Sequence, residues 1–215
     1  MRFSEAETTW AYLELMRRVA LSVGLPLSLY SDRHDIFHTR REPTVIEQLE
    51  NARPLTQFGR AMAELGIHIS KAYSPQAKGR IERLWGVLQD RLVVELRLAS
   101  VSTLAGANAL LDRYLPGHNR RFGVAPREQC PVWRPAPDAR TLDRILCLKG
   151  QRVVGRDHVV SFEGLQLQVP ASRKFFSLAG RPVDVLELRD RSIEVHHGGE
   201  AVARFSHEQV KARTC

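Results

Sequence analysis

The hydrophobic period of the chain changes at Leu142, and this change divides the sequence into two parts. Before it, apolar residues recur every three or four positions over long stretches, which is typical of amphipathic helices. After it, they form short β-prone runs separated by turns such as Glu163-Gly164 and Gly198-Gly199. We therefore expect an α/β part followed by a small all-β domain, and the regular short strands predict a β-barrel.

A proline-rich stretch separates these two parts. Because proline fixes φ, such a stretch behaves as a semi-rigid spacer. We expect the α/β domain to cover residues 1–119, the linker 120–142 and the barrel 143–215.

Four helices and two strands are predicted in the first part. The helices cover residues 8–23, 55–65, 76–98 and 104–115, and the strands cover 27–30 and 67–70. Pro116-Gly117 is expected to stop the last helix. The segment Arg33–Pro54 is polar and has no periodicity, so we expect a functional loop near the site that touches DNA or a partner subunit.

Two acidic residues stand where a site would form. Asp32 follows the predicted strand 27–30, and Glu82 lies early on the predicted helix 76–98. We expect Glu82 to lie on the flank of a buried apolar stripe that runs from Ile81 to Leu96. A strand-end carboxylate and a helix carboxylate that converge would suit Mg²⁺, which prefers one or two carboxylates with water and phosphate oxygens.

Other ligand sets remain open. His34 and His38 offer nitrogen ligands beside Asp32, but no helix fixes both rings on one face. Asp35 offers a second carboxylate close to Asp32, as an unrelated basic α/β nuclease would need.

The overall charge favours a polyanionic partner. The formal net charge is +8, which favours binding to nucleic acid first. The three cysteines form no CxxC pair, so neither a disulfide framework nor a zinc site is expected, and this suits a reducing cytoplasm. No apolar run approaches the ~20 residues that cross a membrane.

Several motifs together resemble the second half of an insertion-sequence transposase catalytic domain. They are LYSDRHDIF, TQFGRAMAELGI, SPQAKGRIERLWGVLQDRL, HNRRF from His118 to Phe122, and VVSFEGLQLQVP. The superfamily is that of the DDE transposases and retroviral-type integrases, and the ISNCY-type group is the most similar. The resemblance implies a partial RNase H-like integrase core with its first strands missing, followed by the small β-barrel.

In that family three carboxylates bind Mg²⁺ or Mn²⁺ for strand transfer at a DNA phosphodiester. Asp32 matches the second and Glu82 the third, while the first belongs on a strand upstream of Met1. Glu5 and Glu7 are not expected to replace it, because they precede a helix on the far side of the expected strand order. The resemblance also implies phosphate contacts from a set of basic residues: Lys71, Lys78, Arg80, Arg83, Arg120 and Arg121. For Arg120 and Arg121 a basic linker covering the core remains an equal alternative.

The leading hypothesis is therefore a DNA-binding, transposase-derived protein that is not expected to catalyse strand transfer alone, because the first catalytic Asp is missing. The expected partners are DNA, at the element ends and the target, and either further copies of the chain or full-length transposase subunits. The expected location is the bacterial cytoplasm, at the nucleoid, without membrane contact. The alternative is a non-catalytic DNA-binding or subunit-interaction protein that modulates a full-length transposase.

Overall fold

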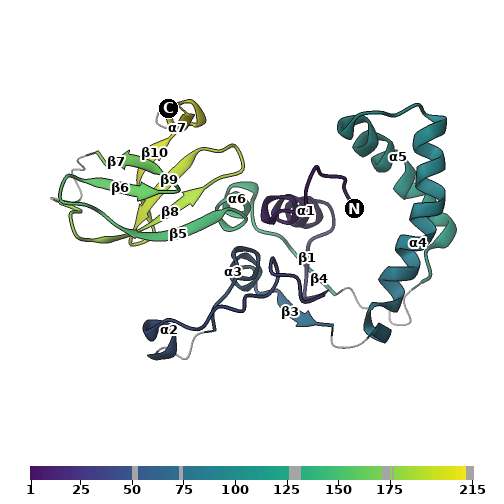
Figure 1. The fold of residues 1–215 in the computed structure, drawn as a ribbon, viewed down its shortest axis with the longest axis horizontal. Helices are drawn as coiled ribbons and strands as arrows, with labels where there is room; N and C mark the ends of the chain where they lie inside the picture. The colour runs from purple at the N-terminus through teal and green to yellow at the C-terminus, as the bar shows by residue number, and fades with distance from the viewer. Residues whose placement is uncertain (50–52, 73–74, 126–131, 171–174, 176, 212–215) are drawn as a thin grey trace. The chain divides into compact units, whose positions relative to one another are not determined.

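The computed structural model describes residues 1–49, 53–72, 75–125, 132–170, 175 and 177–211 (Figure 1). The chain forms two compact units. The first contains Met1–Leu15 and Ser22–Pro135, and the second contains Met16–Leu21 and Ala136–Cys215. Helix α1, Thr9–Ser22, contributes residues to both. Among the described residues, no helix combines the length and the apolar character that crossing a bilayer requires.

A parallel strand pair carries the predicted strand end of the first unit. Strand β2, Ser28–Ser31, pairs with β3, His68–Lys71, in a register that sets Ser31 beside Lys71. The chain between them includes α2, Val45–Leu49, and α3, Gln57–Glu64. Parallel strands need such a crossover, so α3 and the two strands form a β–α–β unit. Both predicted strands are confirmed.

Helix α3 forms because its sequence supplies a cap and an apolar face. Thr56 accepts a hydrogen bond from the backbone N–H of Gly59, which satisfies one free donor at the helix start. Phe58, Ala61 and Met62 face inward and are almost fully buried. This packing fixes α3 against the layer that carries β2 and β3.

A second, smaller sheet closes the first unit. Strand β1, Leu25–Pro26, pairs antiparallel with β4, Trp133–Arg134. Gly24, with φ +114°, enters this pair where an added Cβ would lie 2.6 Å from the carbonyl oxygen of Arg134. Nη2 of Arg134 donates to the carbonyl oxygens of Leu65 and Gly66, at 2.8 and 2.9 Å. A guanidinium at these carbonyls caps the C-terminus of α3.

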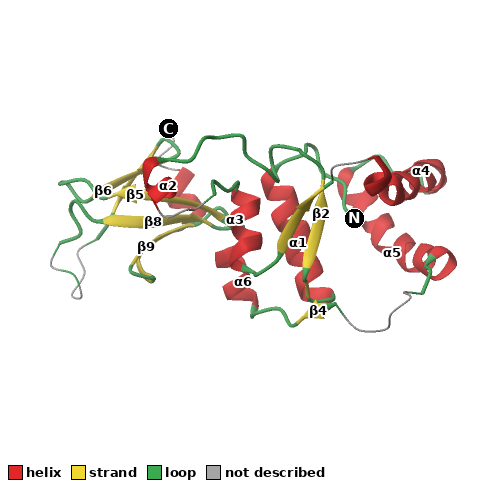
Figure 2. Ribbon diagram, turned by 90° about the horizontal axis from the view of Figure 1, so that it is seen from below, coloured by secondary structure: helices red, strands yellow, loops and turns green. Residues whose placement is uncertain are grey.

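Helices α4, Pro75–Leu98, and α5, Leu104–Phe122, lie side by side as a hairpin (Figures 1 and 2). Leu92 of α4 packs against Leu110 and Leu111 of α5, and Phe3 adds to this cluster. Asn108 holds the backbone of Phe3 from both sides: its Oδ1 accepts from the Phe3 N–H at 2.9 Å and its Nδ2 donates to the Phe3 carbonyl at 3.1 Å.

The predicted end of the fourth helix at Pro116 is wrong, because α5 continues through Pro116 to Phe122. A proline removes one intrahelical hydrogen bond. The last turns are held by side-chain packing: His118 is buried, its ring lies 4.9 Å from that of Phe122, and its Nδ1 lies 3.4 Å from the hydroxyl of Tyr114. The start of the predicted linker is therefore helical.

The second unit combines a short helix, α6, Ala139–Ile145, with six strands and a C-terminal helix, α7, His207–Lys211. The strands are β5, Leu148–Val153; β6, Val159–Phe162; β7, Leu165–Gln168; β8, Pro182–Glu187; β9, Ile193–His197; and β10, Glu200–Phe205. They form a four-stranded sheet in the order β10-β9-β8-β5 and a separate β6–β7 hairpin.

The predicted closed barrel is not seen in the described residues. Val160 and Leu167 of the hairpin share one core with Val185 and Val195 of the larger sheet. The two sheets therefore pack face to face, and their edge strands do not join by a continuous hydrogen-bonded ladder. The mixed α/β class with a strand-rich second part is confirmed.

Candidate functional site

Asp32 lies immediately after β2, at the strand end where the sequence predicted it. Its side chain is exposed, and its Oδ1 accepts a hydrogen bond from the backbone N–H of His34 at 3.1 Å. The register of the parallel pair sets the end of β3 beside that of β2 and joins the Ala72 N–H to the Ser31 carbonyl at 2.8 Å. The carboxyl ends of β2 and β3 therefore present Asp32 and Lys71 at one edge of the sheet.

Glu7 lies in the same neighbourhood, which the sequence did not predict. The hydroxyl of Tyr12 donates to Oε1 of Glu7 at 2.5 Å, and Oε2 of Glu7 lies 3.9 Å from Nε2 of His34. Burial, the bond to Glu7 and the negative charges of Glu7 and Asp32 together raise the pKa of Tyr12. Two carboxylates thus act on one phenol, which stays protonated and serves as a donor to Glu7.

His38 is tied to the strand rather than available as a ligand beside Asp32. Its Nε2 lies 3.0 Å from Oγ of Ser31. Burial and the positive charge of Lys71 lower the pKa of His38, against a smaller opposite effect of Asp32. A lowered pKa favours the neutral imidazole, which is the form that binds metals, but within the described residues Asp32, His34 and His38 are not grouped to hold an ion.

The segment after Asp32 is anchored by aromatic packing. The ring of Phe37 lies 4.9 Å from that of Tyr12 and 5.4 Å from that of Phe58, both in edge-on arrangements. Such pairs add to the apolar burial of the rings. The first part of the predicted loop Arg33–Pro54 is thus held on the first unit, and the loop also contains α2.

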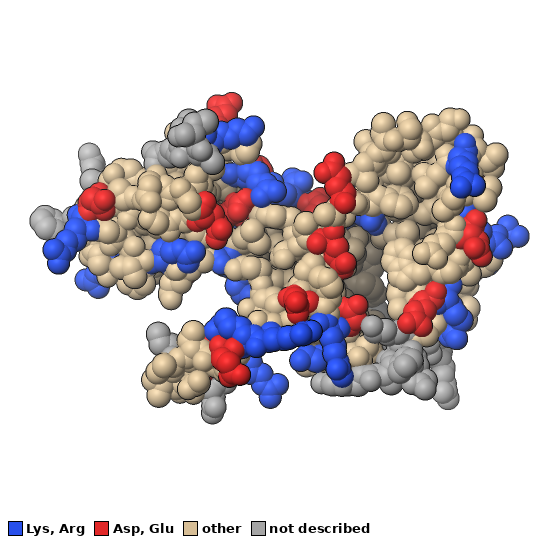
Figure 3. All heavy atoms as spheres, in the orientation of Figure 1, with Lys and Arg blue, Asp and Glu red and all other residues tan. Residues whose placement is uncertain are grey.

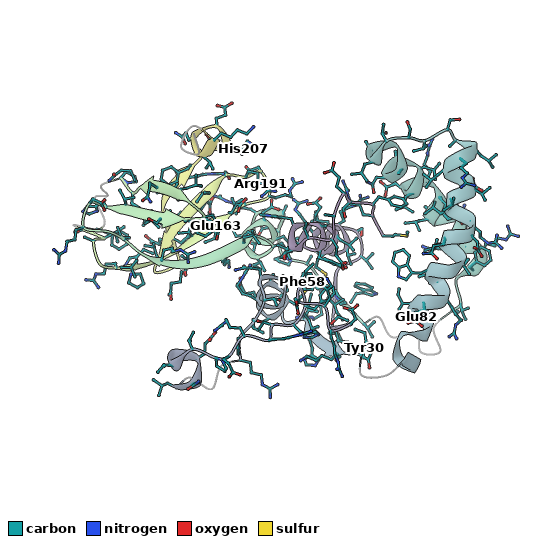
Figure 4. All side chains as sticks on the ribbon, in the orientation of Figure 1. Tyr30, Phe58, Glu82, Glu163, Arg191 and His207 are labelled. Atoms are coloured by element: carbon teal, nitrogen blue, oxygen red, sulfur yellow. The ribbon has the colours of Figure 1, made fainter. Side chains whose placement is uncertain are left out.

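Glu82 is placed on an exposed part of α4 (Figure 4). The apolar stripe beside it is only half buried: Leu88 and Leu92 are 3% exposed, whereas Ile81 is 48% and Trp85 45% exposed. The prediction of a fully buried stripe is therefore wrong for the first turns of α4, where the described residues supply no covering layer.

The described residues do not form a complete metal site. Within them, no group of three or more His, Cys, Asp or Glu side chains is placed to hold a metal ion. Asp32 follows β2 whereas Glu82 belongs to α4, and residues 73–74 between β3 and α4 lie outside the described ranges. The side chains present thus do not fit a metal ion by themselves.

The predicted basic residues fall into three places. Lys71 ends β3 and is exposed, as is Arg83 on α4. Arg120 and Arg121 are exposed in the last turn of α5, where the guanidinium of Arg121 lies 5.4 Å from the ring centroid of Phe122. The side chains of Lys78 and Arg80 lie outside the described part of the structure, so their prediction stays a prediction.

A further group of basic side chains was not predicted to form a band. Figure 3 shows Lys and Arg side chains gathered over the stretch from α2 to β3, with acidic side chains between them. Among the arginines between positions 33 and 53, Arg33, Arg40 and Arg53 are exposed, whereas Arg41 binds Glu47 through both terminal nitrogens, at 2.8 and 2.6 Å. The density of arginines between positions 33 and 53 was the available signal.

Comparison with known proteins gives two informative matches. No protein-family model matches the chain. The chain is 34% identical over 205 residues, or 94% of its length, to a protein of Sinorhizobium fredii named as a transposase, y4bF. It is 32% identical over 166 residues, or 75% of its length, to the transposase for insertion sequence IS1202 of Streptococcus pneumoniae. The chain spans 43% and 34% of the lengths of these two relatives.

Proposed function

We propose that this chain is the C-terminal portion of a DDE-type transposase of the ISNCY-type group, and that it acts on DNA in transposition in the bacterial cytoplasm. The observation that carries the proposal is the similarity to a transposase-named protein over 94% of the chain, which takes in both units. The position of Asp32 at a strand end and of Glu82 on the following long helix agrees with the order of carboxylates in that superfamily.

The fold proposed for the first unit is part of an RNase H-like integrase core. The parallel pair β2–β3, its crossover α3 and the long helix α4 correspond to the second half of such a core. The exposed side chains of Ile81 and Trp85 support this proposal, because apolar residues repeated along one helix face favour a covering layer. In a longer protein, preceding strands would supply that layer.

The catalytic part of the proposal assigns Asp32 and Glu82 as two of three carboxylates for Mg²⁺ or Mn²⁺. The resembled family uses three carboxylates for the two ions, and the further carboxylate would come from the preceding strands. We derive no chemical step from the present residues alone. The chain by itself is therefore proposed to be inactive in strand transfer.

DNA binding is proposed to use the exposed basic side chains of the first unit. Lys71 lies beside the Asp32 strand end, and the arginines between positions 33 and 53 extend from it. Lys78, Arg80, Arg83, Arg120 and Arg121 complete the proposed set. Contacts of this kind neutralise phosphates and make binding dependent on salt but hardly on sequence.

A second candidate function is a non-catalytic protein that joins or inhibits a full-length transposase. It is favoured by one contrast: the second unit has its own continuous core of buried side chains, while the carboxylate site of the first unit is incomplete. Such a protein would bind DNA without any metal dependence, or would associate with transposase subunits or with further copies of itself.

The test is a supercoiled-plasmid nicking assay with Mg²⁺ or Mn²⁺, run beside a gel-shift assay on the same samples. The chain is compared with Asp32→Asn, Glu82→Gln, Asp35→Asn and, as a matched control on the same helix, Glu95→Gln. We expect DNA to be shifted and no version to nick it.

Three results would change the proposal. One result is that the unmodified chain and Glu95→Gln nick DNA while Asp32→Asn and Glu82→Gln do not. This result would refute the proposed inactivity of the isolated chain but would support Asp32 and Glu82 as metal-binding carboxylates. Nicking that is kept in Glu82→Gln but lost in Asp35→Asn would favour the unrelated nuclease. If the unmodified chain does not shift DNA in the gel at low salt, the proposal that it binds DNA is refuted.

A further inference from the structure

The second unit contains a hollow of about 250 Å³ that the carboxylate site does not involve. We call it the arginine hollow, because four arginines line it. Its walls come from α6, from the turn between β8 and β9, and from β9 and β10; the lining residues are Arg140, Asp143, Arg144, Leu188, Arg189, Asp190, Glu194 and Arg204.

Each of the three carboxylates in the arginine hollow is already bound by a neighbour. Asp143 accepts from Nε of Arg17 at 2.5 Å. Asp190 accepts from the hydroxyl of Ser192 at 2.6 Å. Glu194, whose side chain is 4% exposed, accepts from Nε of Arg144 at 3.0 Å and lies 2.9 Å from Nε2 of His196.

The balance of formal charge in the arginine hollow is positive. Four guanidinium groups and three carboxylates line the hollow, which leaves one positive charge in excess. The side chain of Arg204 is 59% exposed, and Arg140 and Arg189 are also exposed. An anion can therefore reach the rim without displacing the buried Glu194 network.

The backbone that carries these arginines is held in place. Asp138 caps α6 by accepting from the N–H groups of Arg140 and Thr141, at 2.9 and 3.0 Å. The turn after β8 is closed by a bond of 2.8 Å from the Leu188 N–H to the Ser192 carbonyl. Two held segments thus present Arg140 and Arg189 from different walls, which lowers the entropic cost of binding one ligand between them.

We propose that the arginine hollow binds a phosphate group of a nucleic-acid backbone. The planar guanidinium offers paired N–H donors that match phosphate oxygens, and several arginines converging on one hollow favour an anion with several oxygens. That the ligand is a phosphate is inferred from the arginine hollow itself. That this phosphate belongs to a nucleic acid rests on the proposed function.

A neighbouring hollow provides the internal control. Figure 4 labels Glu163, Arg191 and His207, which line a second hollow of about 340 Å³ together with apolar side chains. There Nη1 of Arg191 donates to Glu187 at 2.6 Å. Arg189 and Arg191 belong to the same turn but line different hollows.

The experiment measures binding of a fluorescent DNA duplex by anisotropy between 50 and 200 mM salt. It compares the chain with Arg140→Gln/Arg189→Gln and with the control Arg191→Gln, each checked for folding by circular dichroism. Each neutralised phosphate contributes a factor of about three to four to the loss of affinity between 50 and 200 mM salt. A variant that no longer neutralises one phosphate should therefore lose less affinity over this range, by that factor. We expect that reduction in the double variant and not in Arg191→Gln; equal salt slopes for all three proteins would overturn the proposal.

A second measurement separates this proposal from the proposed function. Inorganic pyrophosphate is titrated into labelled protein while the NMR signals of the Arg144 and Arg204 side chains, which line the same hollow and are kept in the double variant, are followed. A chain that binds no DNA can still show pyrophosphate shifts that disappear in the double variant. This result would support a phosphate site in the arginine hollow and would refute only nucleic acid as its ligand. The absence of both DNA binding and pyrophosphate shifts would overturn the inference entirely.

Discussion

Nε of Arg144 lies 3.0 Å from Oε2 of Glu194, and this bond ties α6 to the buried face of β9. Glu194 belongs to the most buried strand of the second unit, yet it carries a formal charge. Its second buried partner is His196. A charge this deeply buried is tolerated only while its partners are present.

Glu194→Gln is therefore expected to destabilise the chain. The amide leaves Arg144 and His196 without their anion, and a hydrogen bond to a charged group contributes about 1.5–3 kcal/mol. Because Arg144 keeps a third of its side chain exposed, we expect the free energy of unfolding to fall by about 2 kcal/mol. Urea unfolding measures this, with the exposed Glu200→Gln as control; equal midpoints for the two variants would contradict it.

The same carboxylate should make stability depend on pH. Burial alone would raise the pKa of Glu194, but hydrogen bonds from His196 and Arg144 outweigh burial and hold the pKa below its ordinary value. A lowered carboxylate pKa adds stability above the unfolded pKa, and this stability is lost as pH falls through the folded value. Unfolding free energies measured from pH 6 down to pH 3 should therefore fall less steeply in Glu194→Gln than in the unmodified chain.

Alanine substitutions at two glycines should change the free energy of unfolding in opposite directions. Gly24 has φ +114° and no room for a Cβ against Arg134, so Gly24→Ala is expected to cost about 1–3 kcal/mol and to weaken the β1–β4 pair. Gly86 lies inside α4 with no atom within 4 Å of an added Cβ, so Gly86→Ala should stabilise by up to about 1 kcal/mol. Thermal unfolding of both variants checks the pair, and a Gly24→Ala variant as stable as the unmodified chain would contradict this backbone geometry.

The two halves of α4 should differ in their tolerance of polar substitution. Leu92 is 3% exposed in the α4–α5 core, so Leu92→Ala should cost about 2–5 kcal/mol. Trp85 is 45% exposed, so Trp85→Ser should change the unfolding free energy of the isolated chain by no more than about 0.5 kcal/mol. Urea unfolding compares the two.

The proposed covering layer adds a second expectation for this pair. A purified segment of a longer relative that carries the proposed preceding strands should bind the unmodified chain, and Trp85→Ser should weaken that binding. Calorimetry measures it. Equal binding by both chains would contradict the covering role of the preceding strands.

Long periodic elements were predictable because their signal is local. The helix expected at 76–98 is α4 at Pro75–Leu98, and the strands expected beside Asp32 are β2 and β3. The same local reasoning failed at Pro116, where the packing of His118 on Phe122 outweighs the missing hydrogen bond. It also failed just after Leu142, where only β-prone runs were expected, because the cap at Asp138 starts a helix that continues to Ile145.

Contacts between distant segments could not be predicted in the same way. The period of α4 defined an apolar face but not what covers it, so Ile81 was expected to be buried. At the candidate site, the position of Asp32 followed from the strand pattern. The approach of Glu7 through Tyr12 depends on how α1 packs, for which a single sequence carries no signal. Likewise, strand lengths in the second unit were predictable, but whether the sheets close depends on register across strands.

The capping of α3 by Arg134 has a consequence for the order in which the protein is made. The two partners, Leu65 and Arg134, are 69 positions apart in the sequence. A bacterial ribosome adding roughly 5–20 residues per second needs about 3 to 14 seconds to cover that interval. During that time the emerging β–α–β unit has neither its cap nor the β4 partner of β1. The first unit is therefore expected to reach its final structure only once Pro135 has left the exit tunnel, whatever the second unit does afterwards.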